Sequence, residues 1–363
     1  MQPVSELLSY AKRNISDAEQ EIARDFISGK TQGAYLIGKN EVSESLIGRF
    51  PVTGIIDDRA APGTLWKNVP AVKSSQLGKE ASVINCSFSI SPLSVHRLLQ
   101  GLGVRHIPFC VLPELYKDIP PPAFVQEFRK DAHEHRHEWE QVYALLGDGE
   151  SRKVFSDITR FRLSGDYGFM KDYTIRFKDQ YFDPVIKTSP EEVLVDCGGY
   201  DGDTAMEFIR RYEHYKKIYV FEPSAENFNR ARNNLAPYAN IELVLSGVSD
   251  TPGQLYFNAS EGSASHVDGQ GTERINVETL DHYIQDKVTF IKMDIEGWEA
   301  KALRGAENHI RQDHPKLTIA VYHHASDFWK IPRIVLGIRK DYAVYLRHYS
   351  EGWSETIMYF IPV

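Results

Sequence analysis

The sequence VLVDCGGYDGDT, residues 193–204, holds the strongest fold signal in this chain. Its apolar start is typical of a central parallel strand that is buried on both faces of a sheet. The glycines that follow, Gly198, Gly199 and Gly202, let the backbone turn sharply and come close to a ligand. The stretch therefore predicts a strand, a tight turn and a helix, the opening unit of a parallel α/β sheet.

An acidic residue follows the next predicted strand. Residues 217–221 are mostly apolar and lead into Glu222, which lies 222 − 202 = 20 residues after the third glycine. An acid at this position can accept hydrogen bonds from both hydroxyls of a ribose. The turn and the acid together predict an adenosine-containing ligand, either a dinucleotide or S-adenosylmethionine. The alternative is a turn whose glycines serve packing alone.

Other polar residues stand where later strands are expected to end. Strands are predicted at residues 241–245, 288–294, 317–322, 342–346 and 356–361, the last of them antiparallel. The polar residues at the strand ends are Asp196, Glu222, Asp294, Glu296, His323 and His324. Ligands of open parallel sheets bind outside the carboxyl ends of the strands, so these side chains are the first candidates for a site.

These motifs resemble those of class I S-adenosylmethionine-dependent methyltransferases, and among them the FkbM-type family is the most similar. The resemblance is strongest at the sequence IKMDIEGWE, residues 291–299, and it covers the chain from near Gln180 onward. The sequence CGGY at residues 197–200 stands where many members have a hydrophobe, glycine, alanine and asparagine. The other matching motifs lie at residues 180–182, 195–204, 221–224, 277–281, 303–306, 322–324, 345–349 and 355–359.

The resemblance implies a Rossmann-like, seven-stranded class I methyltransferase sheet over residues 191–363. It implies transfer of a methyl group from S-adenosylmethionine to a hydroxyl of a small molecule or glycan: a sugar, an intermediate of polysaccharide biosynthesis or a secondary metabolite. Asp196 is expected at the methionine amino group, Glu222 at the ribose and Val248 behind the adenine. The full set expected to bind the donor is Asp196, Gly198, Gly199, Tyr200, Gly202, Glu222, Val248, Asp250 and Asp294.

Methyl transfer to a hydroxyl also requires a group that removes a proton. Asp294 and Glu296 occupy alternate positions at the end of one strand, and His323 ends another, so we expect all three to face one pocket beside the methyl group. His323 is the natural general base, because a free imidazole titrates near neutral pH. Alternatively, the three side chains share a divalent cation, which we do not favour, or His323 and His324 are core histidines. Residues 259–273, rich in glycine and serine, are expected to form either a lid or an ordinary connection.

Residues 1–112 predict a second Rossmann-like α/β domain, of unknown role. Its expected strands, at residues 34–38, 52–58 and 81–86, alternate with helices, as in a parallel sheet. Gly38 after the first strand and Asp57-Asp58 after the second resemble half of a dinucleotide site, but the rest of the glycine fingerprint is missing. A non-catalytic protein that binds a sugar nucleotide or a dinucleotide is therefore the alternative function.

Residues 113–190 predict a helical linker, with one long helix from Phe124 to Leu146. The sequence HEHRH at residues 133–137 formally matches the H-E-x-x-H zinc signature. The helix is rich in charged residues and no third ligand follows at close spacing, so we interpret the match as accidental and expect no metal there.

The composition limits the kinds of partner and the compartment that we expect for this chain. The chain has 363 residues with 42 Lys and Arg against 50 Asp and Glu, a formal charge of −8. This acidic balance does not favour nucleic acid as a partner. No apolar stretch approaches the roughly 18 residues of a membrane span, and the N-terminus lacks the apolar segment of a signal peptide. The three cysteines are far apart and odd in number, which favours a reducing cytoplasm.

Overall fold

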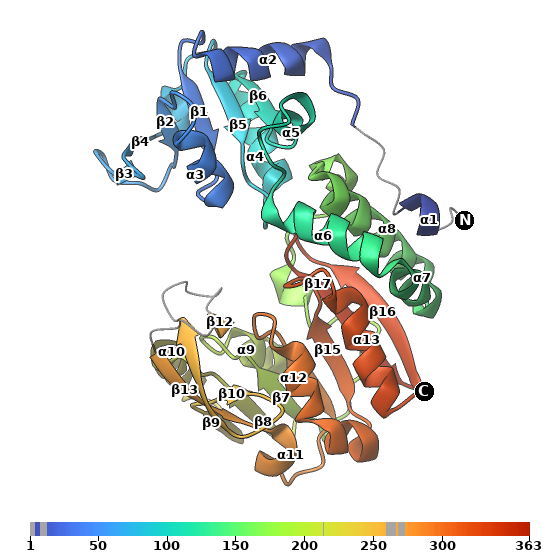
Figure 1. Ribbon diagram of the computed structural model, residues 1–363. Coiled ribbons are helices and arrows are strands. Elements are labelled where there is room, and N and C mark those ends of the chain that lie inside the picture. Colours follow the sequence, from blue (N-terminus) through green and yellow to red (C-terminus); the bar gives the residue numbers. More distant parts are fainter. Residues whose placement is uncertain (1–3, 8–12, 213, 259–265, 268–272) are drawn as a thin grey trace. The chain divides into compact units, whose positions relative to one another are not determined.

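The structure is a computed structural model that describes every residue except 1–3, 8–12, 213, 259–265 and 268–272 (Figure 1). The chain divides into two units. Unit one comprises Met1–Arg136, Phe155–Ile175 and Tyr349–Ser354, and unit two comprises His137–Val154, Arg176–His348 and Glu355–Val363. This division differs from the three-part sequence prediction, because residues 113–190 are shared between the units.

Unit one is built on a six-stranded sheet in the order β3-β4-β2-β1-β5-β6. Every pair of neighbours is parallel except β3 and β4, which form a short antiparallel hairpin. The sequence prediction of a parallel N-terminal sheet is confirmed. The strands are β1 (Ala34–Ile37), β2 (Gly54–Ile56), β3 (Leu65–Trp66), β4 (Val69–Val72), β5 (Ser82–Asn85) and β6 (Arg105–Pro108).

Alternate residues of these strands pack into two separate cores. Leu36 and Ile84 belong to a core that includes Phe26 and Leu46 of helices α2 and α3. Their neighbours Ile37 and Val83 belong to a second core, with Leu99 of helix α4. Side chains of a strand point alternately to the two faces, so helices cover both faces of the sheet. The helices that lie wholly or mostly in unit one are α1 (Val4–Leu7), α2 (Asp17–Ser28), α3 (Glu41–Ile47), α4 (Pro92–Leu102), α5 (Val111–Leu115), α6 (Ala123–Glu134) and α8 (Gly149–Ser164).

A segment from near the C-terminus completes unit one. The backbone N–H of Trp353 donates to the carbonyl of Phe88 at 2.9 Å, and the buried carboxylate of Glu351 accepts from the N–H and hydroxyl of Ser94 at 2.6 and 2.8 Å. These contacts explain why Tyr349–Ser354 belongs to a unit that is otherwise formed by the first half of the chain.

Unit two contains a seven-stranded sheet in the order β16-β17-β15-β14-β7-β8-β9. All neighbours are parallel except β17, which runs antiparallel to both β15 and β16. The predicted class I methyltransferase sheet and its antiparallel last strand are confirmed. The strands are β7 (Val193–Cys197), β8 (Lys217–Phe221), β9 (Ile241–Val244), β14 (Phe290–Met293), β15 (Lys316–Ala320), β16 (Tyr342–His348) and β17 (Thr356–Pro362).

Short strands and further helices complete the described part of unit two. β10 (Gly247–Val248), β11 (Gly253–Asn258), β12 (His266–Val267) and β13 (Glu273–Glu278) form a four-stranded sheet. The helices are α7 (Arg136–Leu145), α9 (Asp203–Arg211), α10 (Ala225–Leu235), α11 (Leu280–Tyr283), α12 (Glu299–Arg304) and α13 (Asp327–Ile338). Single helical turns of other types lie at Ser74–Gln76, Tyr167–Met170, Phe177–Asp179 and His309–Asp313.

The long helix predicted from Phe124 to Leu146 is wrong in one respect, because the structure has two helices there. His135, with φ −120° and ψ 33°, lies between α6 and α7. His133 and His137 therefore do not lie four residues apart on one continuous helix, as a zinc signature requires. Both side chains are exposed, in agreement with an accidental motif match. Among the described residues, no helix is both long and apolar enough to cross a membrane.

Candidate active site

The glycine turn after β7 is shaped by close contacts with two neighbouring strands. The N–H groups of Gly198 and Gly199 both donate to the carbonyl of Phe221, at 3.0 Å each. Gly198 has φ +81°, and a Cβ at this position would collide with the carbonyl oxygen of Asp294. A left-handed backbone and such contact leave no room for a side chain. The turn thus lies directly against Asp294, the residue that follows β14.

A buried ion pair fixes the other side of this turn. The carboxylate of Asp196 is fully buried, and its Oδ1 lies 3.0 Å from Nζ of Lys292 on β14. Lys292 also donates to the carbonyl of Gly198 at 2.7 Å. Burial lowers the pKa of Lys292, but Asp196 and Asp294 outweigh it, so the net pKa is raised and the lysine stays charged. In the structure Asp196 pairs with Lys292. The expected contact of Asp196 with the methionine amino group of S-adenosylmethionine stays a prediction.

Sequence reasoning missed Lys292. A lysine inside a strand whose other residues are apolar was the available signal, because such a residue is rarely buried without a charged partner.

Glu222 lies at the glycine turn, as its spacing in the sequence predicts. Its two oxygens accept from the backbone N–H groups of Tyr200 and Ser224, both at 2.9 Å. Burial raises the pKa of Glu222, and these hydrogen bonds offset part of the shift. Tyr200 has φ +45°, so it is a strained non-glycine residue in the turn. The acid is in place to meet a ligand on this turn, and its contact with a ribose stays a prediction.

The predicted adenine segment lies beside the start of α12. Val248 is buried on β10, and the hydroxyl of Ser249 donates to Asp250 at 3.2 Å. The indole N–H of Trp298 in turn donates to the Ser249 hydroxyl at 3.2 Å. The structure therefore links residues 248–250 to the segment that follows Asp294.

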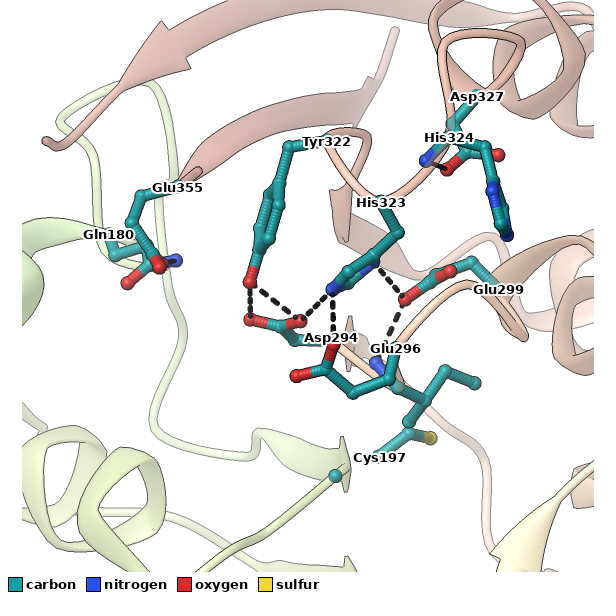
Figure 2. Close-up of polar contacts among 12 residues, drawn as sticks. Gln180, Cys197, Asp294, Glu296, Glu299, Tyr322, His323, His324, Asp327 and Glu355 are labelled. Atoms are coloured by element: carbon teal, nitrogen blue, oxygen red, sulfur yellow. Dashed lines mark hydrogen bonds and ion pairs between the residues drawn. The ribbon is translucent and has the colours of Figure 1, made fainter. Parts of the chain in front are cut away.

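Asp294 is held by two phenols, from segments 141 residues apart (322 − 181). Tyr181 donates to its Oδ2 at 2.5 Å. Tyr322 donates to both of its oxygens at 3.2 Å, as Figure 2 shows. Burial and the adjacent Asp294 raise the pKa of each tyrosine well above its ordinary value, so both stay protonated and donate. Both tyrosines belong to motifs of the resemblance, but sequence reasoning gave neither a role.

His323 lies among three carboxylates, and Figure 2 shows its ring between Asp294 and Glu299. Nε2 is 3.4 Å from Asp294 Oδ1 and 3.2 Å from Glu296 Oε2, while Nδ1 is 3.1 Å from Glu299 Oε1. Only 7% of the histidine side chain is exposed. Burial lowers the pKa of His323, but Glu299, Glu296 and Asp294 outweigh it and raise the pKa well above that of a free imidazole. The resting ring is therefore a cation at neutral pH.

The structure brings the three predicted catalytic side chains together and adds Glu299 to them. The ring of His324, by contrast, points away from Asp294 (Figure 2) and is exposed, and its backbone N–H donates to Asp327 at 2.8 Å. Residues that could hold a cation are Asp294, Glu299 and His323, which each offer one donor atom within 4.8 Å of the others. The proposed lid, residues 259–273, lies largely outside the described residues.

Part of the chain is similar in sequence to known methyltransferases. Residues 196–351 match the methyltransferase FkbM domain. The chain is 27% identical over 143 residues to the 2-O-methyltransferase NoeI of Sinorhizobium fredii. That match covers 32% of this chain and 58% of NoeI, so the chain spans little more than half the length of this relative.

A solved structure extends the similarity of fold to nearly the whole chain. The methyltransferase FkbM of Methylobacillus flagellatus KT superposes with a TM-score of 0.73 and 22% identity, over 93% of each chain. At this identity the likeness shows the fold. Residues 196–351 of this chain thus match the methyltransferase FkbM domain, and the chain has the fold of a class I methyltransferase over this part.

Proposed function

We propose that this chain is an S-adenosylmethionine-dependent O-methyltransferase whose acceptor is a hydroxyl of a sugar, a glycan intermediate or a secondary metabolite. One observation carries the proposal: Asp294, Glu296 and His323 converge at the glycine turn of a methyltransferase domain. The name of NoeI, a 2-O-methyltransferase, supports an oxygen acceptor.

The donor, when bound, supplies a methyl group on a positively charged sulfur. Transfer forms a carbon–oxygen bond to the acceptor, breaks the carbon–sulfur bond and leaves a neutral thioether. The proton of the acceptor hydroxyl must then pass to a group of the protein.

Glu296 and His323 together suit this proton transfer. A cationic His323 cannot take a proton, so it is not a base by itself in the resting state. Burial raises the pKa of Glu296, and His323 offsets part of this shift, so its carboxylate is a stronger base than an exposed one. With the two groups 3.2 Å apart, Glu296 takes the proton while the imidazolium stabilises the charge that develops on the acceptor oxygen.

A shared divalent cation is the second candidate for activating the hydroxyl. The supporting observation is the spacing of donor atoms from Asp294, Glu299 and His323. A cation would lower the pKa of a bound hydroxyl and replace the proton on His323. The test is activity after exhaustive chelation: a loss that Mg²⁺ or Mn²⁺ restores establishes the cation, and unchanged activity excludes it.

The alternative binding function of unit one has less support, because its two strand-end acids have local partners. Asp57 pairs with Lys39 and accepts from the N–H groups of Arg59 and Ala60, at 2.9 and 3.2 Å. Asp58 accepts from the N–H and hydroxyl of Ser74, at 2.7 and 2.8 Å. Glu222 also accepts from two backbone N–H groups, so the feature that sets Asp57 apart is its ion pair with Lys39.

Calorimetric titration separates the two functions. We expect S-adenosylhomocysteine to saturate the chain, while NAD and a UDP-sugar give no heat of binding. Saturation by NAD or the UDP-sugar, with no effect of S-adenosylhomocysteine, would favour the alternative. Screening of hydroxylated acceptors with labelled S-adenosylmethionine then tests the class of acceptor.

A further inference from the structure

We propose that Glu299 is a positioning residue that binds Nδ1 of His323 and so directs Nε2 toward Asp294 and Glu296. Its importance for catalysis rests on the proposed function, but the contact itself does not.

One oxygen of Glu299 joins the two loops of the site. Glu299 is the first residue of α12 and only 1% of its side chain is exposed. Its Oε1 accepts from the backbone N–H of Ile295 at 2.8 Å and lies 3.1 Å from Nδ1 of His323. The loop after β14 and the segment after β15 are therefore connected through this single atom.

The backbone contact determines which group donates to the ring. A backbone N–H can only donate, so the oxygen that faces Ile295 must be an acceptor. The same oxygen lies 3.1 Å from Nδ1 as an ion-pair partner, so we place the hydrogen of this contact on the nitrogen. A carboxylate that fixes one ring nitrogen of a histidine sets what the other nitrogen presents to its surroundings.

The other ring nitrogen of His323, Nε2, faces groups that we assign to the reaction, so the orientation of the ring matters for catalysis. Nε2 faces the carboxylates of Asp294 and Glu296, and the Tyr322 ring packs against the imidazole with centroids 4.1 Å apart. Tyr181 completes the surroundings through its hydrogen bond to Asp294. A ring rotated by half a turn would break the contact with Glu299 and move Nε2 away from the two carboxylates at the glycine turn.

The nearby backbone brings Glu299 to this position. Glu296 and Gly297 have φ +56° and +88°, so the chain reverses between Asp294 and α12. A Cβ at Gly297 would lie 2.6 Å from the ring of His324, which leaves little room for any other residue. The sequence DIEGWE at residues 294–299 thus directs three carboxylates toward one imidazole.

Proton NMR of the chain without donor or acceptor tests the contact. We expect a low-field resonance from the Nδ1 proton of His323, assigned by its loss in His323→Gln. It should disappear in Glu299→Ala, and in Glu299→Gln it should remain but move upfield, because an amide oxygen is a weaker acceptor than a carboxylate. Glu307→Ala is the control, since that exposed side chain pairs with Arg311.

Kinetics then test the consequence of this contact. Loss of a group that orients a functional histidine typically costs about 10- to 100-fold in activity. We expect a fall of this size in kcat for Glu299→Ala, a smaller fall for Glu299→Gln, and unchanged affinity of both for S-adenosylhomocysteine.

The outcomes separate the two proposals. An Nδ1 resonance that is identical in wild type and Glu299→Gln overturns the inference, even where Glu299→Ala fails to fold. A normal kcat in a variant that has lost the resonance overturns it as well. Resonances as expected, in a chain that methylates no hydroxyl, uphold the contact and instead contradict the proposed function.

Discussion

The first two strands of the main sheet in each unit are followed by the same kinds of residue, but the strand on the other side of the first strand is not. In unit one, Gly38 follows the first strand and Asp57 follows the second, and in unit two Gly198 and Glu222 take these places. Both glycines have positive φ, +100° and +81°, and both acids accept two backbone N–H groups. The local pattern of a glycine and an acid that binds backbone amides is therefore common to both sheets.

The difference lies in which amides the acids bind and what the next strand carries. Asp57 binds amides two and three residues after itself, whereas Glu222 binds the amide of Tyr200 in the glycine turn. On the other side of the first strand, β5 ends in neutral residues and β14 leads into Asp294. We therefore expect the strand on this side of the first strand, more than the glycine turn, to decide whether a sheet carries reactive side chains.

The largest expected effect comes from removing the imidazole of unit two. His323→Ala should lower turnover by about 10²- to 10³-fold, the usual contribution of a group that stabilises charge developing in the transition state. Affinity for S-adenosylhomocysteine should stay as in wild type, because the glycine turn and Glu222 are intact. Steady-state kinetics and calorimetry measure the two quantities.

His324→Ala is the matched control, since its exposed ring points away from Asp294 (Figure 2) and turnover should hardly change. A fall of less than about threefold in His323→Ala would remove His323 from the reaction.

The next prediction compares the two acids. Glu222→Ala should weaken S-adenosylhomocysteine binding by roughly 10- to 150-fold, since a hydrogen bond to a charged group contributes about 1.5–3 kcal/mol. Asp57→Ala should leave this affinity unchanged, because its carboxylate serves Lys39 and two nearby amides. Equal losses in the two variants would show that the sheets do not differ as we propose.

The two glycines give a third and smaller comparison. Gly38→Ala would place a Cβ 2.9 Å from the backbone of Cys86, and Gly198→Ala would place one against the carbonyl of Asp294. Each should destabilise its own sheet by about 1–3 kcal/mol, the usual cost of such strain. Native-state hydrogen exchange of β1 and β7 measures the two losses separately.

Only Gly198→Ala should also weaken binding of S-adenosylhomocysteine. An equal loss of affinity in Gly38→Ala would assign a ligand to unit one and reverse the comparison.

Much of this arrangement could be predicted from the sequence. Apolar runs that end in polar residues predicted the strands of unit two, and parallel topology predicted that Asp294, Glu296 and His323 meet. The pairing of Lys292 with Asp196 could not be predicted in the same way, because it depends on the register between β7 and β14. Tyr181 lies outside the sheet and Glu299 follows a reversal at positive φ, so neither position follows from strand periodicity.

A second cluster of carboxylates in unit two surrounds an arginine instead of a histidine. The kind of positively charged side chain determines whether such a cluster can transfer protons. Arg347, at the end of β16, lies near three carboxylates as His323 does, at 2.8 Å from Asp148, 3.4 Å from Glu150 and 3.3 Å from Asp183. A guanidinium stays charged at any pH near neutral, so this cluster can neither accept nor release a proton. We therefore expect Asp148→Asn to affect stability alone.

The effect of Asp148→Asn should be the smallest, and its pH dependence has a definite sign. Burial raises the pKa of Asp148, but Arg347 and Ser151 outweigh it and lower the pKa to about 2. The stabilisation is therefore complete above the ordinary aspartate pKa of about 4 and is lost as the pH falls through about 2. At pH 6 the variant should lose about 1 kcal/mol or less, since Asp148 is 34% exposed and Arg347 keeps two other partners. Urea unfolding of both proteins between pH 6 and 2 should show the difference shrinking, with turnover at pH 7 unchanged, and a difference that grew toward acid would contradict this assignment.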